Sequence, residues 1–136
     1  MPRVLVVDDE HLIADTLSMI LSRNGFEVCA AYSGEDAVSR AREFLPDAII
    51  SDVTMPGISG IQAAMRILGD LPSCRVFLFS GQASIAEQLS EARARGYDFP
   101  LLLKPLHPEA VIALLRKELE PHRVLTFPAN PTLAVQ

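Results

Sequence analysis

Five short apolar runs alternate along the chain with five longer segments of helical periodicity, and this alternation restricts the fold more than any other feature. The runs lie near residues 3–7, 26–31, 47–51, 75–80 and 100–103. Runs of this length, rich in β-branched residues and leucine, are typical of buried strands. Five strand–helix units in succession predict an α/β fold with a parallel sheet, right-handed crossovers and helices on both faces.

The segments between the runs carry the apolar spacing of amphipathic helices. In the first of them we expect Leu12-Ile13, Leu17 and Ile20-Leu21 to form the buried stripe, with Asp9 or Glu10 as the N-cap. Pro100 opens the last strand, which suits an edge strand because proline has no N–H to donate to a ladder. The first helix is expected to end at Asn24-Gly25, and further helices are predicted over residues 33–45, 61–68, 85–95 and 108–121.

A chain of 136 residues has the size of one domain. With 49% hydrophobic and 21% charged residues, it has the composition of a globular protein rather than a disordered one. The strand–helix pattern does not continue after Pro121. We therefore expect one domain over residues 1–121 and a tail over residues 122–136, without an effector domain.

Charge and cysteine usage exclude several classes of function. The net charge of −5, with no basic stripe, argues against binding to nucleic acid, and no apolar run is long enough to cross a membrane. Cys29 and Cys74 lack metal-ligand spacing and are expected to be small core residues of a protein in the reducing cytoplasm. His11, His107 and His122 have no ligand-like neighbour and are expected to be ordinary surface or capping residues.

Four of the apolar runs end on polar residues that the predicted sheet would bring together. These residues are Asp8-Asp9, Asp52, Ser80 and Lys104. The carboxyl ends of parallel strands meet at one edge of the sheet, where open α/β folds bind ligands. Three carboxylates, a hydroxyl and an ammonium at that edge predict a site for a hard cation and a phosphoryl group.

The charges of this cluster indicate which cation it would hold. Two carboxylates about 4 Å apart repel each other by roughly 4 kcal/mol at an effective dielectric constant near 20, so a divalent cation would stabilise the cluster. Oxygen ligands favour Mg²⁺, Ca²⁺ or Mn²⁺ over zinc, and the absence of a calcium-loop spacing favours Mg²⁺. A carboxylate beside Mg²⁺ can attack phosphorus and form an acyl phosphate, while Lys104 neutralises phosphoryl charge and Ser80 donates a hydrogen bond.

Over residues 3–120 the chain resembles the response-regulator receiver domain of two-component signalling. The resemblance rests on four segments: Val6-Val7-Asp8-Asp9-Glu10, Asp52-Val53-Thr54-Met55-Pro56 with Gly60, Ser80-Gly81, and Lys104-Pro105. It implies a flavodoxin-like (βα)5 fold with strand order 2-1-3-4-5. It also implies a protein that catalyses only its own phosphorylation and dephosphorylation, rather than an enzyme acting on other substrates.

The resemblance implies a role for each polar strand end. Asp52 would accept the phosphoryl group from a phosphohistidine of a sensor histidine kinase or phosphotransfer protein. Asp8, Asp9, Asp52 and the backbone carbonyl of Thr54 would bind Mg²⁺. By the same resemblance, Ser80 and Lys104 would bind the phosphoryl group, and Pro105 would follow a cis peptide bond. An output protein or a second copy of the chain would bind the face formed by the fourth and fifth helices.

One position departs from the family pattern. Leu101 stands where the family usually has an aromatic switch residue, and the segment from Gly96 to Lys104 is one residue longer than usual. Phe99 could take the switch role only through a shifted loop. This departure keeps open an interaction module that works without phosphorylation.

A further alternative is a phosphohydrolase that works through an aspartyl phosphate. Such enzymes of the haloacid-dehalogenase type place a DxD motif on the first strand and carry a sizeable cap domain. This chain has adjacent aspartates at that place and no room for a cap.

Overall fold

The structure is a computed structural model that describes residues 1–81 and 85–119. The predicted tail, with His122, lies outside these residues. Strands and helices alternate strictly along the described chain, as the apolar runs predict. The elements are β1 (Arg3–Val7), α1 (His11–Ser22), β2 (Glu27–Ala31), α2 (Gly34–Phe44), β3 (Ala48–Asp52), α3 (Gly60–Asp70), β4 (Arg75–Ser80), α4 (Ala86–Ala94), β5 (Leu101–Leu103) and α5 (Pro108–Leu119).

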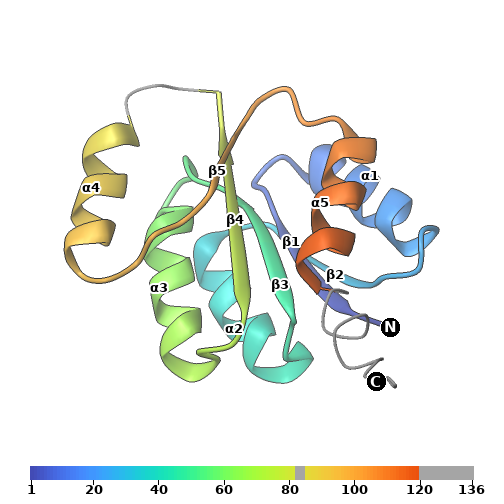
Figure 1. Ribbon diagram of the computed structural model, residues 1–136, viewed down its shortest axis with the longest axis horizontal. Coiled ribbons are helices and arrows are strands. Elements are labelled where there is room, and N and C mark those ends of the chain that lie inside the picture. Colours follow the sequence, from blue (N-terminus) through green and yellow to red (C-terminus); the bar gives the residue numbers. More distant parts are fainter. Residues whose placement is uncertain (82–84, 120–136) are drawn as a thin grey trace, which may run out of the picture.

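The five strands form one parallel sheet in the order β2-β1-β3-β4-β5, which confirms both the predicted fold class and the strand order. Helices cover both faces: α2, α3 and α4 lie on one side of the sheet, and α1 and α5 lie on the other (Figure 1). A parallel sheet covered on both faces needs apolar side chains on both sides of each central strand. This is why β1, β3 and β4 are nearly continuous apolar runs.

The core consists of two apolar layers, one on each face of the sheet. Alternate residues of a strand point to opposite faces. In β1, Leu5 and Val7 pack toward α2 and α3, whereas Val4 and Val6 pack toward α1 and α5. The two layers enclose β1 and β3, and these two strands lead to the acidic residues of the predicted site.

The predicted buried stripe of α1 is partly wrong. Leu12 is 80% exposed and Ile13 is 39% exposed, whereas Ala14, Leu17 and Leu21 are buried. The helix therefore turns Ala14, rather than Leu12 or Ile13, toward the sheet. Glu10 occupies the N-cap position, but its side chain makes no capping hydrogen bond.

Local capping signals account for the starts of α2 and α3. Ser33 accepts a hydrogen bond from the Asp36 N–H, and Ser59 forms a reciprocal capping box with Gln62. The third helix ends near Gly69, as predicted, although α3 itself continues through Gly69 to Asp70. Glycine weakens a helix without ending it when the next turn still packs on its neighbours.

β5 is a three-residue edge strand, as Pro100 before it indicates. Leu103 is 71% exposed, so the apolar run that leads to Lys104 is only partly buried. Met55, in the loop after β3, is 8% exposed and belongs to the apolar layer on the side of α2 and α3. Cys74 is buried and Cys29 is half-buried. Among the described residues, no helix combines the length and the apolar character needed to span a membrane.

Candidate functional site

The predicted polar strand ends do meet at the carboxyl edge of the sheet. Asp8 directly follows β1 and Asp52 is the last residue of β3, and these two strands are neighbours at the point where the strand order reverses. Side-chain oxygens of Asp8, Asp9 and Asp52 all lie within 4.8 Å of one another. This is the spacing at which carboxylates can share one cation, and it places the acidic cluster at the ligand-binding position of open α/β sheets.

Asp8 is the most deeply buried member of the cluster. Its side chain is 0% exposed, and its Oδ1 atom accepts a hydrogen bond of 2.9 Å from the Glu10 N–H. Oδ2 is buried and has no hydrogen-bond partner among the described residues. The pKa of Asp8 is raised to about 6, mainly by burial and also by the charge of Asp52, although the hydrogen bond from the Glu10 N–H opposes the shift. An unpartnered, buried carboxylate oxygen fits a metal ligand.

Asp52 is held from both sides of its carboxylate. Oδ1 accepts a hydrogen bond of 3.2 Å from the Thr54 N–H, and Oδ2 lies 3.2 Å from the Lys104 Nζ. The residue is only 6% exposed. One oxygen is thus oriented by the backbone of the following loop, and the other by the ammonium of the residue that follows β5, two strands away in the sheet.

Lys104 contributes a positively charged side chain to the site. Burial lowers its pKa, but the hydrogen bond to Asp52 and the charges of Asp52 and Asp8 outweigh burial, so the pKa is raised overall. Its Nζ lies 5.3 Å from the centroid of the Phe79 ring, within the range of a cation–π contact. The ammonium is therefore charged and directed at Asp52.

Ser80 and Lys104 are linked through the backbone. The Lys104 N–H donates a hydrogen bond of 3.1 Å to the Ser80 carbonyl, and Ser80 is 1% exposed at the end of β4. The Lys104–Pro105 peptide bond is cis, as the resemblance implies. The end of β4 and the start of the loop after β5 thus lie together at the same edge as the acidic cluster.

The loop after Asp52 is fitted tightly against α3. The Gly60 N–H donates a hydrogen bond of 2.9 Å to the Val53 carbonyl. A Cβ atom at Gly60 would overlap the backbone carbonyl of Asp52 and would lie 2.9 Å from the Ser51 Oγ. Only glycine leaves this space free, so Gly60 sets how closely α3 approaches the end of β3.

The structure also shows where the aromatic residues near β5 lie. Leu101 is half-buried and pairs with Leu78 of β4. Phe99 precedes β5, is 8% exposed and stacks on Tyr97 with ring centroids 5.8 Å apart. Phe99 is thus a core residue near the opposite end of β5 from Lys104. The aromatic ring beside Lys104 is Phe79, which was not identified from the sequence; its position one residue before Ser80 was the available signal.

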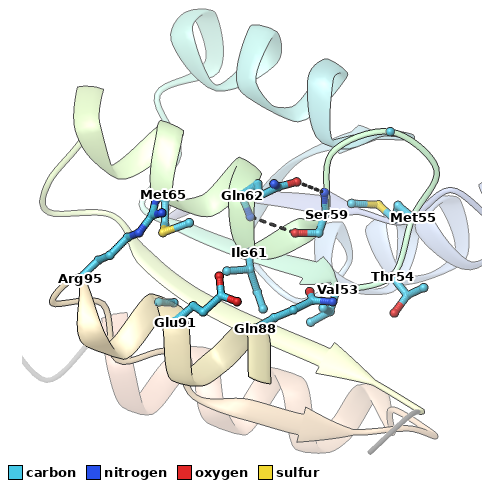
Figure 2. A pocket seen from close by; sticks show the side chains of 12 residues that line it. Val53, Thr54, Met55, Ser59, Ile61, Gln62, Met65, Gln88, Glu91 and Arg95 are labelled. Atoms are coloured by element: carbon cyan, nitrogen blue, oxygen red, sulfur yellow. Dashed lines mark hydrogen bonds between the residues drawn. The ribbon is translucent and has the colours of Figure 1, made fainter. Parts of the chain in front are cut away.

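Beside the acidic cluster, a hollow of about 390 Å³ opens between α3 and α4 (Figure 2). Thr54 and Met55 line the hollow on the right of Figure 2, Gln88 and Glu91 line it from α4, and Arg95, the residue after α4, also lines it. Polar side chains on this face of α4 leave little apolar surface for packing against α3. Ala92 is the only buried residue of α4, whose nine residues are all described, whereas α3 buries five of its residues.

This difference in packing predicts a difference in local stability. Backbone amides of α4 are expected to exchange with solvent at least about tenfold faster than those of α3, because few buried contacts oppose local opening of α4. Hydrogen exchange followed by NMR would measure both helices in one sample, with α5, which buries three residues, as an internal reference. Equal protection of α3 and α4 would contradict the expectation.

A family model for the response regulator receiver domain matches residues 4–116 of the chain. The chain belongs to the response-regulator receiver family. It is 33% identical to the chemotaxis protein CheY of Thermotoga maritima over 116 residues, which cover 85% of this chain and 95% of that protein. The receiver-domain assignment from the four sequence segments is thereby confirmed, and so is membership of two-component signalling.

Two further matches differ in how much of the related protein this chain covers. The chain is 31% identical over 132 residues to a probable transcriptional regulatory protein of Mycobacterium tuberculosis, TcrX, covering 97% of this chain but only 56% of that protein. The crystal structure of the response regulator TrrA of Thermotoga maritima in complex with Mg²⁺–BeF has a TM-score of 0.74 and 29% identity. That match covers 88% of this chain and all of the TrrA chain.

Proposed function

We propose that this receiver accepts a phosphoryl group on Asp52 from a phosphohistidine, in a Mg²⁺-dependent reaction, and changes its binding to partners as a result. The phosphohistidine would belong to a sensor histidine kinase or a phosphotransfer protein. The observation that carries the proposal is the position of the Asp52 carboxylate, between the Lys104 ammonium and the acidic pair of Asp8 and Asp9.

Asp8, Asp9 and Asp52 would hold the Mg²⁺ ion through carboxylate oxygens, with the Thr54 carbonyl as a further ligand. The unpartnered Oδ2 of Asp8 supports this assignment, as does the 4.8 Å limit on the spacing of the three carboxylates. When bound, Mg²⁺ neutralises charge on the phosphoryl oxygens and on the clustered carboxylates. The Mg²⁺–BeF complex of the relative TrrA is consistent with a site of this kind.

In the proposed transfer, an oxygen of Asp52 forms a bond to phosphorus while the phosphorus–nitrogen bond of the donor breaks. The bonding electrons leave with the imidazole, which takes a proton from solvent, and Asp52 becomes an acyl phosphate. The Thr54 N–H and Lys104 orient the attacking carboxylate, and Lys104 then shifts its interaction to the added phosphoryl charge. Ser80, at the same edge, donates its hydroxyl to a phosphoryl oxygen.

Phosphorylation would add a charge of about −2 at the sheet edge, which must be balanced by Lys104 and the metal. We propose that the resulting shift of the loops after β4 and β5 changes the face formed by α4 and α5. An output protein or a second copy of the chain would bind there. We also propose that the protein acts in the cytoplasm, the location expected from its sequence.

Labelling with a small acyl phosphate donor tests the proposed acceptor. In the presence of Mg²⁺, wild type is expected to gain one phosphoryl group by intact-protein mass spectrometry, and Asp52→Asn is expected to gain none. Asp70→Asn is the matched control, because Asp70 is an exposed aspartate of α3 that pairs with Arg42. Labelling of Asp52→Asn at the wild-type level would contradict the assignment.

The non-aromatic residue at position 101 supports one alternative, a module that binds partners without phosphorylation. Leu101 is a half-buried sheet residue that cannot act as an aromatic switch. Beryllofluoride, which mimics the phosphoryl group, separates the two functions. A working switch is expected to change its hydrodynamic radius or its partner binding when Mg²⁺ and beryllofluoride are added, and unchanged behaviour would favour the alternative.

A further inference from the structure

A three-residue contact lies beside the acidic cluster, and the proposed phosphotransfer does not use it. Tyr32 is the first residue after β2, and its ring stacks on that of His11, the first residue of α1. The ring centroids are 3.9 Å apart, with an interplanar angle of 21°. The Tyr32 hydroxyl also donates a hydrogen bond of 2.6 Å to Asp15 Oδ1, one turn farther along α1.

Hydrogen bonds to the end of β2 fix both ends of the segment from Asp8 to Asp15. At its beginning, the Asp8 N–H donates a hydrogen bond of 3.1 Å to the carbonyl of Ala31, the last residue of β2. At its end, Asp15 is held by Tyr32, the residue that follows Ala31. Asp9 lies inside this closed segment and is exposed. The path of the backbone between Asp8 and Asp15 therefore decides where the Asp9 carboxylate points.

The start of α1 has few other anchors. The N-cap residue Glu10 makes no side-chain capping bond, and its own N–H is engaged by Asp8. The first three residues of the helix are exposed, and the first buried residue is Ala14. With no side-chain cap, and with Ala14 as its first buried residue, the beginning of α1 is held in place in part by the contact with Tyr32.

Electrostatic repulsion works against the acidic cluster whenever no cation is present. Asp8 and Asp52 repel the carboxylate of Asp9, which can relieve the repulsion by moving into solvent because it is exposed. A cation site that must first collect its ligands binds more weakly than one whose ligands are already in place. Any contact that restrains the segment of Asp9 should therefore strengthen cation binding.

We propose that Tyr32, together with His11 and Asp15, is a positioning unit that holds Asp9 in the acidic cluster and so sets the affinity for Mg²⁺. This inference rests on the proposed Mg²⁺ site. The side chain of Tyr32 contacts His11 and Asp15, which are not proposed ligands, and therefore acts through the backbone of α1. Residues that orient metal ligands typically change metal affinity by about 10–100-fold when they are mutated, and an indirect restraint should act at or below the lower end of that range.

Titration of the full chain with Mg²⁺, followed by NMR at fixed pH and ionic strength, tests the inference. Tyr32→Ala removes the stack and the hydrogen bond and is expected to raise the Kd about 3–10-fold. Tyr32→Phe keeps the ring but loses the bond to Asp15, so about a 2–3-fold rise is expected. A Kd of Tyr32→Phe between those of wild type and Tyr32→Ala would show that the stacked ring contributes to the affinity without the hydrogen bond. Neither substitution changes the charge of the protein.

Tyr97→Ala is the matched control. Tyr97 is also a half-buried tyrosine stacked on an aromatic ring, but it lies near the opposite end of the sheet, beside Phe99. Its loss is expected to lower stability and to leave the Kd for Mg²⁺ unchanged. An equal rise of the Kd in Tyr97→Ala would mean that general loosening of the fold weakens the site, which would overturn the inference.

The remaining outcomes separate the inference from the proposed function. If wild type binds Mg²⁺, Asp8→Asn does not, and Tyr32→Ala binds as tightly as wild type, the metal site stands and the positioning role is wrong. If wild type binds no Mg²⁺, the metal site itself is wrong and the inference is overturned with it. Should Tyr32→Ala fail to fold, Tyr32→Phe decides the question, because a Kd equal to that of wild type would contradict the role of the Tyr32–Asp15 bond.

Discussion

Metal-free Asp8→Asn protein is expected to be about 2–3 kcal/mol more stable than wild type at neutral pH, although the same change should abolish Mg²⁺ binding. Asp8 is 0% exposed, and its pKa is raised to about 6, first by burial and then by the charge of Asp52. Its negative charge at neutral pH therefore opposes folding. Asparagine removes the charge, keeps the acceptor for the Glu10 N–H, and gives the unpartnered position a donor that can face Asp52.

The pH dependence follows from the direction of the shift. The pKa of Asp8 rises from 3.8 in the unfolded chain to about 6 in the folded protein. Between these values the folded state binds more protons than the unfolded state, so rising pH destabilises wild type across this window. The advantage of Asp8→Asn should be fully present above pH 6 and should shrink to below about 1 kcal/mol near pH 4.

Urea denaturation with a chelator present would measure both effects. Asp9→Asn is the matched control, because Asp9 is exposed and the substitution should change stability by no more than about 0.5 kcal/mol. Addition of Mg²⁺ should stabilise wild type through binding to the folded state and should leave Asp8→Asn unchanged. Equal or lower stability of metal-free Asp8→Asn at neutral pH would show that burial of Asp8 carries no electrostatic cost.

Gly60→Ala is expected to destabilise the protein by about 2–4 kcal/mol, the range of severe overpacking. The new Cβ would overlap the carbonyl oxygen of Asp52, which is backbone and cannot move aside like the end of a flexible side chain. Either α3 moves away from β3 or the backbone at Asp52 shifts. Both responses also disturb the oriented carboxylate, so labelling by the acyl phosphate donor should fall together with stability.

Gly69→Ala in the same helix provides the control. A Cβ atom at Gly69 would have nothing within 4 Å, and alanine favours a helix by up to about 1 kcal/mol over glycine. Gly69→Ala is therefore expected to be as stable as wild type or slightly more stable, with unchanged labelling. Chemical denaturation of the two variants checks the pair, and equal effects of the two substitutions would show that the close approach at Gly60 is not restrictive.

Most of the fold could be predicted because its signals are local. Each apolar run is long enough for one strand, some helical segments have their own start signal, such as Ser33, and strand burial on both faces follows from the unbroken apolar runs. The errors occurred where tertiary packing overrides local pattern. Leu12 fits the helical spacing but is 80% exposed, because the smaller Ala14 meets the sheet instead.

Local sequence patterns are enough to predict which polar residues reach the carboxyl edge of the sheet, because a residue that follows a strand must emerge at that strand's end. How these residues are arranged at the edge depends on the packing of the whole fold. The 3.2 Å approach of Lys104 to Asp52, the burial of Asp8 and the stacking of His11 on Tyr32 join segments that are distant in the chain. Such contacts depend on how helices and strands pack together, which no local pattern of residues specifies.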